Sequence, residues 1–311
     1  MSWRDGLDPW CRRWLSASVR AERFVTGWQS AVVGLELDDG REVVIKIRPP
    51  AVGLTTWLAC HRRLWAGGFP CAQPLTTLEP LAGLVASAEQ LLPADSGRPP
   101  RPVEVPELAG VLADLVGRAS TDPVGGSFGA PPDWAGWDRA DPTTGAWPTA
   151  GPGEVDLNAT PEPAWLTEVV AATGRRLRAS ALPGVVGHVD WEPPNLGWTG
   201  PVITAVYDWD SLTVLPEAAV AGLAAAVHPV VDDGPGATVE QTAVFLAAYA
   251  DARGRPWTTE EEQVAWAAGL WVSCYNAKGE AVDGIDGPVT RCLLSELSDR
   301  CARADVRAPR T

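Results

Sequence analysis

Lysine is nearly absent from this chain. Of its 25 Lys and Arg residues only two, Lys46 and Lys278, are lysines, so arginine supplies almost every ordinary surface cation. A lysine kept within the β-rich run 42–47 suggests that this position needs a compact point charge. The alternative is a solvated strand residue that faces outward, away from Ile45 and Ile47. Lys46 is therefore a candidate functional residue.

Long apolar runs are missing as well. No stretch approaches the roughly 18 to 20 residues that span a bilayer, and the N-terminal residues lack the apolar core of a signal peptide. We expect a cytoplasmic protein with no membrane partner. The six cysteines show no C-x-x-C pair or metal-ligand spacing, which favours reduced, packed thiols.

Basic clusters are also absent, which argues against nucleic acid as a partner. Residues 1–93 carry 10 Lys+Arg and 9 Asp+Glu, a net charge of +1, whereas residues 94–311 carry 15 and 30, a net charge of −15, so the acidity lies in the second region. A cleft lined by carboxylates concentrates cations. The excess favours a cationic ligand in this region, and a solubility surface is the alternative.

The most informative segment runs from His188 to Asp208. Asp190 and Asn195 flank a Pro-Pro pair that excludes helix interior, so they lie on a loop. The apolar runs 196–198 and 202–207 are joined by a turn and predict a hairpin, whose ends would bring Asn195 and Asp208 together. Their oxygens suit Mg²⁺ with substrate phosphates. Asp190 is then free to accept a proton, which indicates phosphotransfer.

A sheet is predicted upstream, from the β-rich runs 23–26, 31–37 and 42–47. Asp38-Asp39-Gly40 joins the last two runs as a hairpin. Between the first two, Gly27 to Ser30 form a short turn whose backbone N–H groups could bind phosphates, although one glycine is weak evidence.

These motifs resemble the aminoglycoside phosphotransferase and choline kinase family, relatives of protein kinases. The resemblance implies an α+β, protein-kinase-like two-lobed fold. Residues 1–93 would form an N-terminal nucleotide-binding lobe, an antiparallel sheet with a helix. Residues 94–311 would form a larger, mostly helical catalytic and acceptor-binding lobe, with a Pro/Gly/Trp-rich insertion at 93–159. The length of 311 residues suits two such lobes.

The resemblance also assigns roles. Asp190 is the catalytic base, and Asn195 and Asp208 are the metal ligands. Nucleotide-binding residues are expected at the following positions: Lys46, Gly27 and Ser30 at the phosphates, and the backbone near Gln90 and Leu91 at the adenine. The implied cofactors are Mg²⁺ and ATP, with GTP as an alternative. The chain departs from the family's usual motif at Val189 and at Trp191-Glu192.

One element of a kinase site is not found in the sequence. The strand lysine normally pairs with a glutamate on the following helix, yet no Asp or Glu occurs between Ile47 and Leu78. Either a carboxylate from elsewhere, such as Glu79 or Glu22, holds Lys46, or the phosphates alone position it.

The acceptor site is less well specified. Helices are expected at 161–178, 216–227, 239–252, 258–276 and 293–304. Candidate contacts to a cationic acceptor are Glu192, Asp210, Asn276, Glu280 and Asp283. The Trp-rich insertion could form the rim of the acceptor cleft or wrap the core of its lobe.

We therefore expect an ATP-dependent O-phosphotransferase that acts on a small, cationic molecule, such as an aminoglycoside or another antibiotic, and would confer antibiotic resistance. Three alternatives remain: a kinase-like protein that binds nucleotide or ligand without turnover, a choline, amino-alcohol or sugar kinase, and a metal-dependent phosphoesterase using His188, Asp190 and Asp208. The sequence leaves the acceptor and the oligomeric state open.

Overall fold

The computed structural model describes residues 2–27, 30–93, 95–121, 126–140, 145–149, 155–230 and 234–309. The chain forms two compact units. The first unit contains Met1–Asp95, Pro123–Gly129 and Thr204–Asp210, and the second contains Ser96–Asp122, Ala130–Ile203 and Ser211–Thr311. The segment with Asp208 thus belongs to the unit built by the N-terminal sheet.

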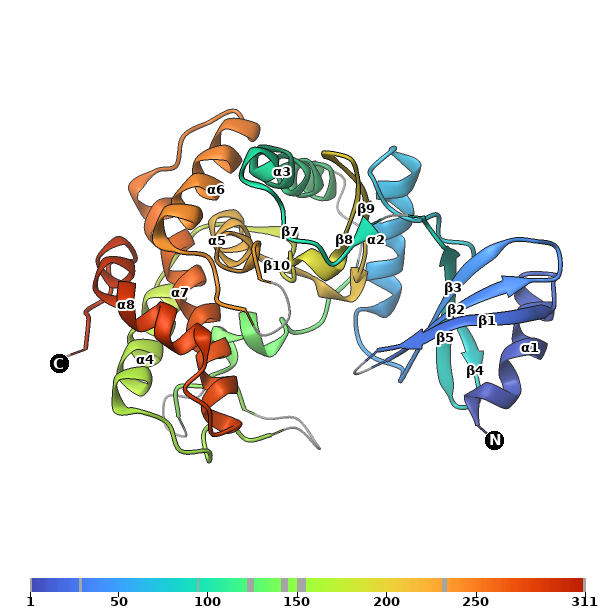
Figure 1. The fold of residues 1–311 in the computed structure, drawn as a ribbon, viewed down its shortest axis with the longest axis horizontal. Helices are drawn as coiled ribbons and strands as arrows, with labels where there is room; N and C mark the ends of the chain where they lie inside the picture. Colours follow the sequence, from blue (N-terminus) through green and yellow to red (C-terminus); the bar gives the residue numbers. More distant parts are fainter. Residues whose placement is uncertain are drawn as a thin grey trace. The chain divides into compact units, whose positions relative to one another are not determined.

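The first unit is built on a five-stranded antiparallel sheet (Figure 1). Its strands are β1 (Val19–Thr26), β2 (Ala31–Leu37), β3 (Glu42–Arg48), β4 (Glu79–Leu81) and β5 (Leu84–Gln90), in the order β1-β2-β3-β5-β4. The helix α2 (Leu54–Ala66) follows β3. The predicted antiparallel sheet with a helix is confirmed.

A helix that the sequence did not predict, α1 (Trp3–Trp14), packs on one face of this sheet. Its apolar side joins the buried strand residues in a single core cluster that includes Leu7, Trp10, Cys11, Leu35, Ile45 and Ile47. Ser2 and Asp5 form a capping box, a local signal for the start of a helix. Pro9 within the helix hid that signal, because proline normally ends a helix.

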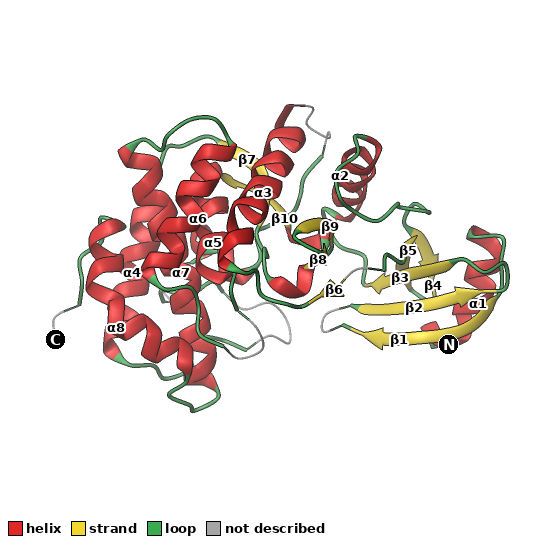
Figure 2. Ribbon diagram, turned by 45° about the horizontal axis from the view of Figure 1, so that its top comes forward, coloured by secondary structure: helices red, strands yellow, loops and turns green. Residues whose placement is uncertain are grey.

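The second unit is mostly helical, as predicted (Figure 2). Its helices are α3 (Val105–Thr121), α4 (Ala164–Arg178), α5 (Glu217–Val227), α6 (Val239–Ala252), α7 (Thr259–Val282) and α8 (Pro288–Arg303). Strand β7 (Gly184–His188) pairs with β10 (Leu212–Pro216), and β8 (Leu196–Thr199) pairs with β9 (Val202–Val206), next to β6 (Asp95–Ser96). The predicted hairpin of β8 and β9 is present, whereas α7 continues beyond its predicted end at Asn276.

Helix α5 forms the centre of the second unit. Every residue of α5 after Glu217 is buried, as expected for a helix that is apolar on all sides. Gly222 faces the backbone of α7, and a Cβ there would lie 2.0 Å from the carbonyl oxygen of Ala265. The close approach of α5 and α7 therefore requires glycine at position 222.

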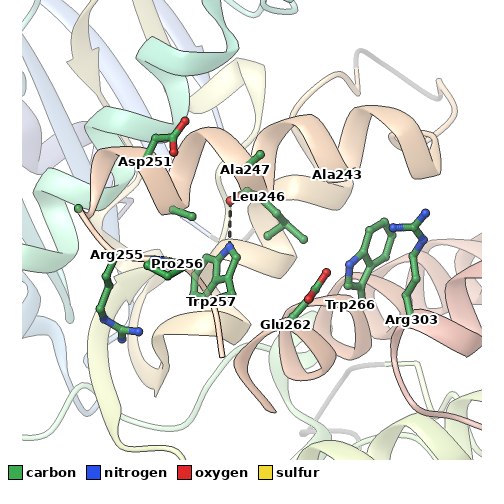
Figure 3. Close-up of a pocket in the computed structure, with 12 residues that line it drawn as sticks. Ala243, Leu246, Ala247, Asp251, Arg255, Pro256, Trp257, Glu262, Trp266 and Arg303 are labelled. Carbon is green, nitrogen blue, oxygen red and sulfur yellow. Dashed lines mark hydrogen bonds between the residues drawn. The ribbon is translucent and has the colours of Figure 1, made fainter. Parts of the chain in front are cut away.

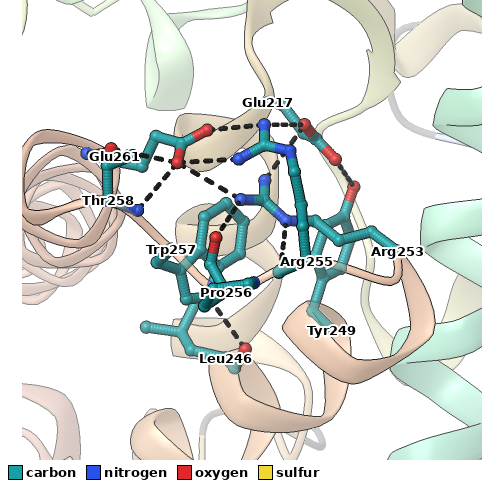
Figure 4. Close-up of polar contacts among 9 residues, drawn as sticks. All are labelled: Glu217, Leu246, Tyr249, Arg253, Arg255, Pro256, Trp257, Thr258 and Glu261. Carbon is teal, nitrogen blue, oxygen red and sulfur yellow. Dashed lines mark hydrogen bonds and ion pairs between the residues drawn. The ribbon is translucent and has the colours of Figure 1, made fainter.

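Charged side chains connect the starts of α5 and α7 with the end of α6 (Figure 4). Arg253 and Arg255 each form ion pairs with both Glu217 and Glu261. Hydrogen bonds from Arg255 lower the pKa of Glu261 to about 2. Arg253 also lies over the ring of Trp257, 3.5 Å from its centroid. This network fixes the turn between α6 and α7.

No helix among the described residues is both long and apolar enough to cross a bilayer.

Replacing Gly222 with alanine should destabilise the second unit. The added Cβ overlaps the Ala265 carbonyl, and such overpacking costs about 1–3 kcal/mol in the free energy of unfolding. Gly117 in α3 is the matched control, because a Cβ there meets nothing within 4 Å. Gly117→Ala should be neutral or stabilising by up to about 1 kcal/mol. Urea unfolding of both variants measures the difference, and equal stabilities would contradict the close packing of α5 on α7.

Candidate active site

The loop after β7 is anchored by its own backbone and by buried rings. The Asp190 N–H donates to Nδ1 of the buried His188 at 3.3 Å, so this histidine helps to hold the loop. Trp191 is fully buried, and its Nε1–H donates to the Leu108 carbonyl of α3 at 3.3 Å. The backbone on both sides of the Asp190 carboxylate is therefore fixed.

Asn195 closes this loop onto Asp190. The prolines at 193 and 194 start a short 3₁₀ turn that ends at Asn195. The side-chain Nδ2 of Asn195 donates to the Asp190 Oδ2 at 2.8 Å and to the Asp190 carbonyl at 2.9 Å. Because an amide donates only through its nitrogen, the Oδ1 of Asn195 is the atom that would hold a metal. The structure thus brings the candidate base and one candidate metal ligand together.

Asp208 follows β9 in the first unit with a φ of +53°. Aspartate tolerates this left-handed conformation better than most residues, and strain of this kind concentrates at functional sites. Trp209 stacks on His61 of α2, with ring centroids 4.5 Å apart. Asp210 forms an ion pair with Arg48 of β3. These contacts fix the Asp208 segment to the sheet, so Asp210 holds the segment rather than extending toward a ligand.

Lys46 has a carboxylate partner that the sequence did not identify. Its Nζ lies 3.3 Å from Oε1 of Glu89 on β5, and each residue is 8% exposed. The two carboxylates considered from the sequence are engaged elsewhere: Glu22 pairs with Arg4 and Glu79 accepts from the Thr77 hydroxyl. The alternative of an outward-facing, solvated lysine is excluded by this burial.

The expected phosphate-binding turn depends on glycine. Gly27 has a φ of +120°, and a Cβ there would lie 1.9 Å from the Ser30 carbonyl oxygen. The two residues between them lie outside the described part of the chain. A cavity of about 480 Å³ is lined by Gly27, Ser30 and Arg48 among others.

The backbone N–H groups of Gln90 and Leu91 are already engaged. They donate to the carbonyls of Gln73 at 2.9 Å and Glu42 at 3.1 Å. An adenine contact at these residues would therefore use their carbonyl oxygens.

Beside Asp190 the second unit contains a cavity of about 300 Å³. Its polar lining is Asp190, Glu192 and Asn276, and its aromatic lining is Trp134 and Tyr275, completed by Val189, Leu223, Val227 and Val272. Trp134 comes from the Trp-rich insertion, and its Nε1–H donates to the Val189 carbonyl at 3.1 Å. Trp134 and Tyr275 were not among the predicted site residues, because only the tertiary fold brings them to the loop.

The remaining predicted acceptor contacts lie apart from this cavity. The buried Glu280 carboxylate accepts the N–H groups of Val289 and Thr290 at 2.9 and 2.8 Å, so it caps the start of α8. Asp283 is an exposed residue at the end of α7. Of the candidates in and after α7, Asn276 is the one that lines the cavity.

Another part of the insertion wraps the core. Lys278, the second lysine of the chain, is fully buried, with Nζ 2.8 Å from Glu162 and 2.7 Å from the Thr160 carbonyl. Trp147 donates to the same Glu162 at 2.8 Å and packs against Trp271. The insertion thus lines a cavity at Trp134 and covers part of the core at Trp147.

A larger cavity, of about 650 Å³, lies among α6, α7 and α8 (Figure 3). Trp257, Trp266 and Arg303 line it, and none of its lining residues belongs to the Asp190 loop. Of these two cavities, the smaller one has Asp190 in its lining.

No cage of three or more His, Cys, Asp or Glu side chains occurs among the described residues. Magnesium in phosphotransfer sites needs only one or two protein carboxylates, since phosphates and water complete its shell. The Asn195 amide in the second unit and the Asp208 carboxylate in the first unit each offer an oxygen of the kind that this ion prefers.

The antiparallel sheet with its buried lysine, the Asp-and-Asn loop and the Asp after β9 define a kinase-like phosphotransferase fold. The profile described as "Phosphotransferase enzyme family" matches residues 20–265, so the chain belongs to that family. It is a kinase-type phosphotransferase. No curated sequence matches the chain.

Solved structures share the fold at low sequence identity. An amicoumacin kinase in complex with AMP-PNP, Ca²⁺ and Ami is 12% identical, with a TM-score of 0.66 over 90% of this chain and 88% of that one. A choline/ethanolamine kinase family protein from Mesorhizobium loti is 14% identical, with a TM-score of 0.61 over 97% and 99%. A spectinomycin phosphotransferase in complex with ADP and spectinomycin is 13% identical, with a TM-score of 0.60 over 95% and 98%.

Glu192→Gln should stabilise the protein at neutral pH. Burial raises the pKa of Glu192, although its hydrogen bond with Asp190 acts in the opposite direction. A raised pKa means that stability is lost as pH rises above about 4.3, the ordinary value for glutamate. The uncharged glutamine avoids this cost, by about 1 kcal/mol at pH 7.

Thermal unfolding at pH 7 and pH 4 measures this effect, with the exposed Glu168→Gln of α4 as the control. The gain from Glu192→Gln should shrink at pH 4, where the carboxyl is mostly protonated in both the folded and the unfolded state. A gain that grew at pH 4 would contradict the assigned direction.

Proposed function

We propose that the protein transfers the γ-phosphate of ATP to a hydroxyl of a small cationic molecule, with Mg²⁺ as the metal. The observation that carries this proposal is the Asp190 carboxylate, which lines the 300 Å³ cavity and accepts a hydrogen bond from the Asn195 amide. A carboxylate held at a cavity wall can accept a proton from a bound hydroxyl. GTP is the alternative phosphate donor.

The nucleotide would be bound by the first unit. Lys46 and the turn at Gly27 and Ser30 would contact the phosphates, and Asn195 and Asp208 would hold the Mg²⁺, which neutralises charge on the phosphates. Binding without turnover would be the better interpretation if Lys46 had no carboxylate partner. Glu89 supplies that partner, which favours an active phosphotransferase.

The acceptor would lie in the cavity beside Asp190. Glu192 offers a carboxylate and Asn276 an amide, while Trp134 and Tyr275 offer ring faces. Carboxylates and ring faces both favour a cation. The neighbours solved with spectinomycin and with Ami support an antibiotic-like acceptor and, with it, a role in antibiotic resistance.

In the proposed reaction the oxygen of the acceptor hydroxyl attacks the γ-phosphorus, while Asp190 accepts the proton of that hydroxyl. The bond to the β-phosphate oxygen breaks, and the products are a phosphate monoester and ADP. The Asn195 amide keeps the Asp190 carboxylate aimed during this step. The protein's contribution is mainly positioning and electrostatic stabilisation.

Asp190→Ala should lower kcat by about 100- to 10,000-fold, the usual contribution of a general base, while ATP still binds. A screen for nucleoside diphosphate release with Mg²⁺, across cationic antibiotics, amino alcohols and sugars, identifies the acceptor for this assay. Asp251→Ala, an exposed aspartate that lines the larger cavity, should leave kcat and KM unchanged. Full activity of Asp190→Ala would show that Asp190 is not the general base.

Asp208→Ala should abolish the dependence of activity on Mg²⁺ concentration, because it removes the one carboxylate of the proposed donor set. Measuring the residual rate of the variant over a range of Mg²⁺ concentrations tests this loss. A normal Mg²⁺ titration in the variant would show that the metal is held elsewhere.

A further inference from the structure

Helix α2 cannot supply the carboxylate that pairs with the strand lysine in protein kinases. From Leu54 to Ala66 it contains no aspartate or glutamate. The residue it directs toward the β3–β5 ion pair is His61, whose Nδ1 lies 3.9 Å from Oε2 of Glu89. The Nε2–H of His61 donates to the Ala72 carbonyl at 2.8 Å, so this carbonyl holds the ring.

His61 adds no charge to the Lys46–Glu89 pair, because its ring stays neutral. Burial lowers the pKa of His61 to about 3, and the charge of Lys46 adds to this effect. Its role is packing, since its ring stacks on Trp209. The charge balance of Lys46 is therefore set within the sheet.

The strand register places Glu89 and Lys46 on one face of the sheet. In the antiparallel pairing of β3 with β5, Glu89 is opposite Val44 and Lys46 is opposite Ser87. Residues two apart on a strand share a face, so Glu89 and Lys46 are diagonal neighbours. The 3.3 Å between Nζ and Oε1 follows from the ladder itself.

Glu89 is buried beside a thiol and a phenol as well as beside Lys46. Its charge contributes to the raised pKa of the Cys71 thiol and of the Tyr207 phenol, after burial in each case. Both groups stay neutral, and the cation paired with Glu89 is Lys46. A buried carboxylate persists only with such a partner.

Resting on the phosphotransferase function proposed above, we infer that Glu89 is the positioning residue that directs the Lys46 ammonium toward the nucleotide phosphates, in place of a helix glutamate. Both partners lie on hydrogen-bonded neighbouring strands, so the pair persists as long as the sheet does. Displacement of α2 does not break it. Lys46 is therefore aligned before the nucleotide arrives, and α2 has no switching role at this site.

The test is a double-mutant cycle on ATP affinity. Mg·ATP is titrated against tryptophan fluorescence in the wild-type protein, Glu89→Gln, Lys46→Ala and the double variant. Glu89→Gln should weaken binding by about 10- to 100-fold when Lys46 is present. In the Lys46→Ala background the same change should alter binding by no more than about twofold.

The direction of the effect separates positioning from simple neutralisation. Removing a negative charge beside Lys46 would, by Coulomb's law alone, strengthen phosphate binding. Unchanged or tighter binding by Glu89→Gln would therefore overturn the inference. An equal loss with and without Lys46 would also overturn it, since a purely structural role of Glu89 does not depend on the lysine.

Glu36→Gln on β2 is the matched control. Glu36 is also a strand glutamate in this sheet, paired with Arg20 at 2.8 Å and Arg23 at 2.6 Å. Its replacement with glutamine should leave the affinity for ATP unchanged. Should Glu89→Gln fail to fold, Glu89→Asp keeps the charge, withdraws the carboxylate by one methylene, and should give a smaller loss that again depends on Lys46. The titration needs no acceptor, so absence of phosphate transfer and failure of this inference are separate results.

Discussion

The hydrogen bonds from the Asn195 amide to Asp190 are the constraint on which the loop after β7 depends. They are possible because the two prolines bend the chain back within five residues, and because His188 and Trp191 fix the backbone around Asp190. One amide thereby orients the carboxylate and leaves its own oxygen for a metal. A carboxylate held in this way would need little reorganisation in the base role that we propose for Asp190, and such positioning is the main source of rate enhancement in phosphoryl transfer.

The chain's two lysines show how charge is used inside this protein. Lys46 pairs with Glu89 in the first unit, and Lys278 pairs with Glu162 in the second. Both ion pairs are largely shielded from solvent. Removing one partner of such a pair leaves an uncompensated charge, which is strongly destabilising. A sequence that otherwise uses arginine has thus kept lysine at the two places where a compact ammonium is enclosed.

Local patterns predicted most of the fold. The hairpin turn at Asp38-Asp39-Gly40, the alternation around Lys46 and the Pro-Pro loop each specify their structure within a few residues, and the structure has the sheet and the β8–β9 hairpin in those places. Glu89 as the partner of Lys46 could not be predicted, because strand order and register bring the two together. The same holds for Trp134, which reaches the Asp190 cavity only through the tertiary path of the insertion.

The central claim is that a phosphoryl group moves from nucleotide to an acceptor hydroxyl. Phosphorus NMR of a reaction that contains the protein, ATP, Mg²⁺ and an acceptor identifies the phosphorus products directly. The account predicts ADP and one phosphate monoester in equal amounts, with the ester coupled to protons of the carbon that carried the hydroxyl. ADP accompanied only by inorganic phosphate would contradict it, because the site would then transfer phosphate to water.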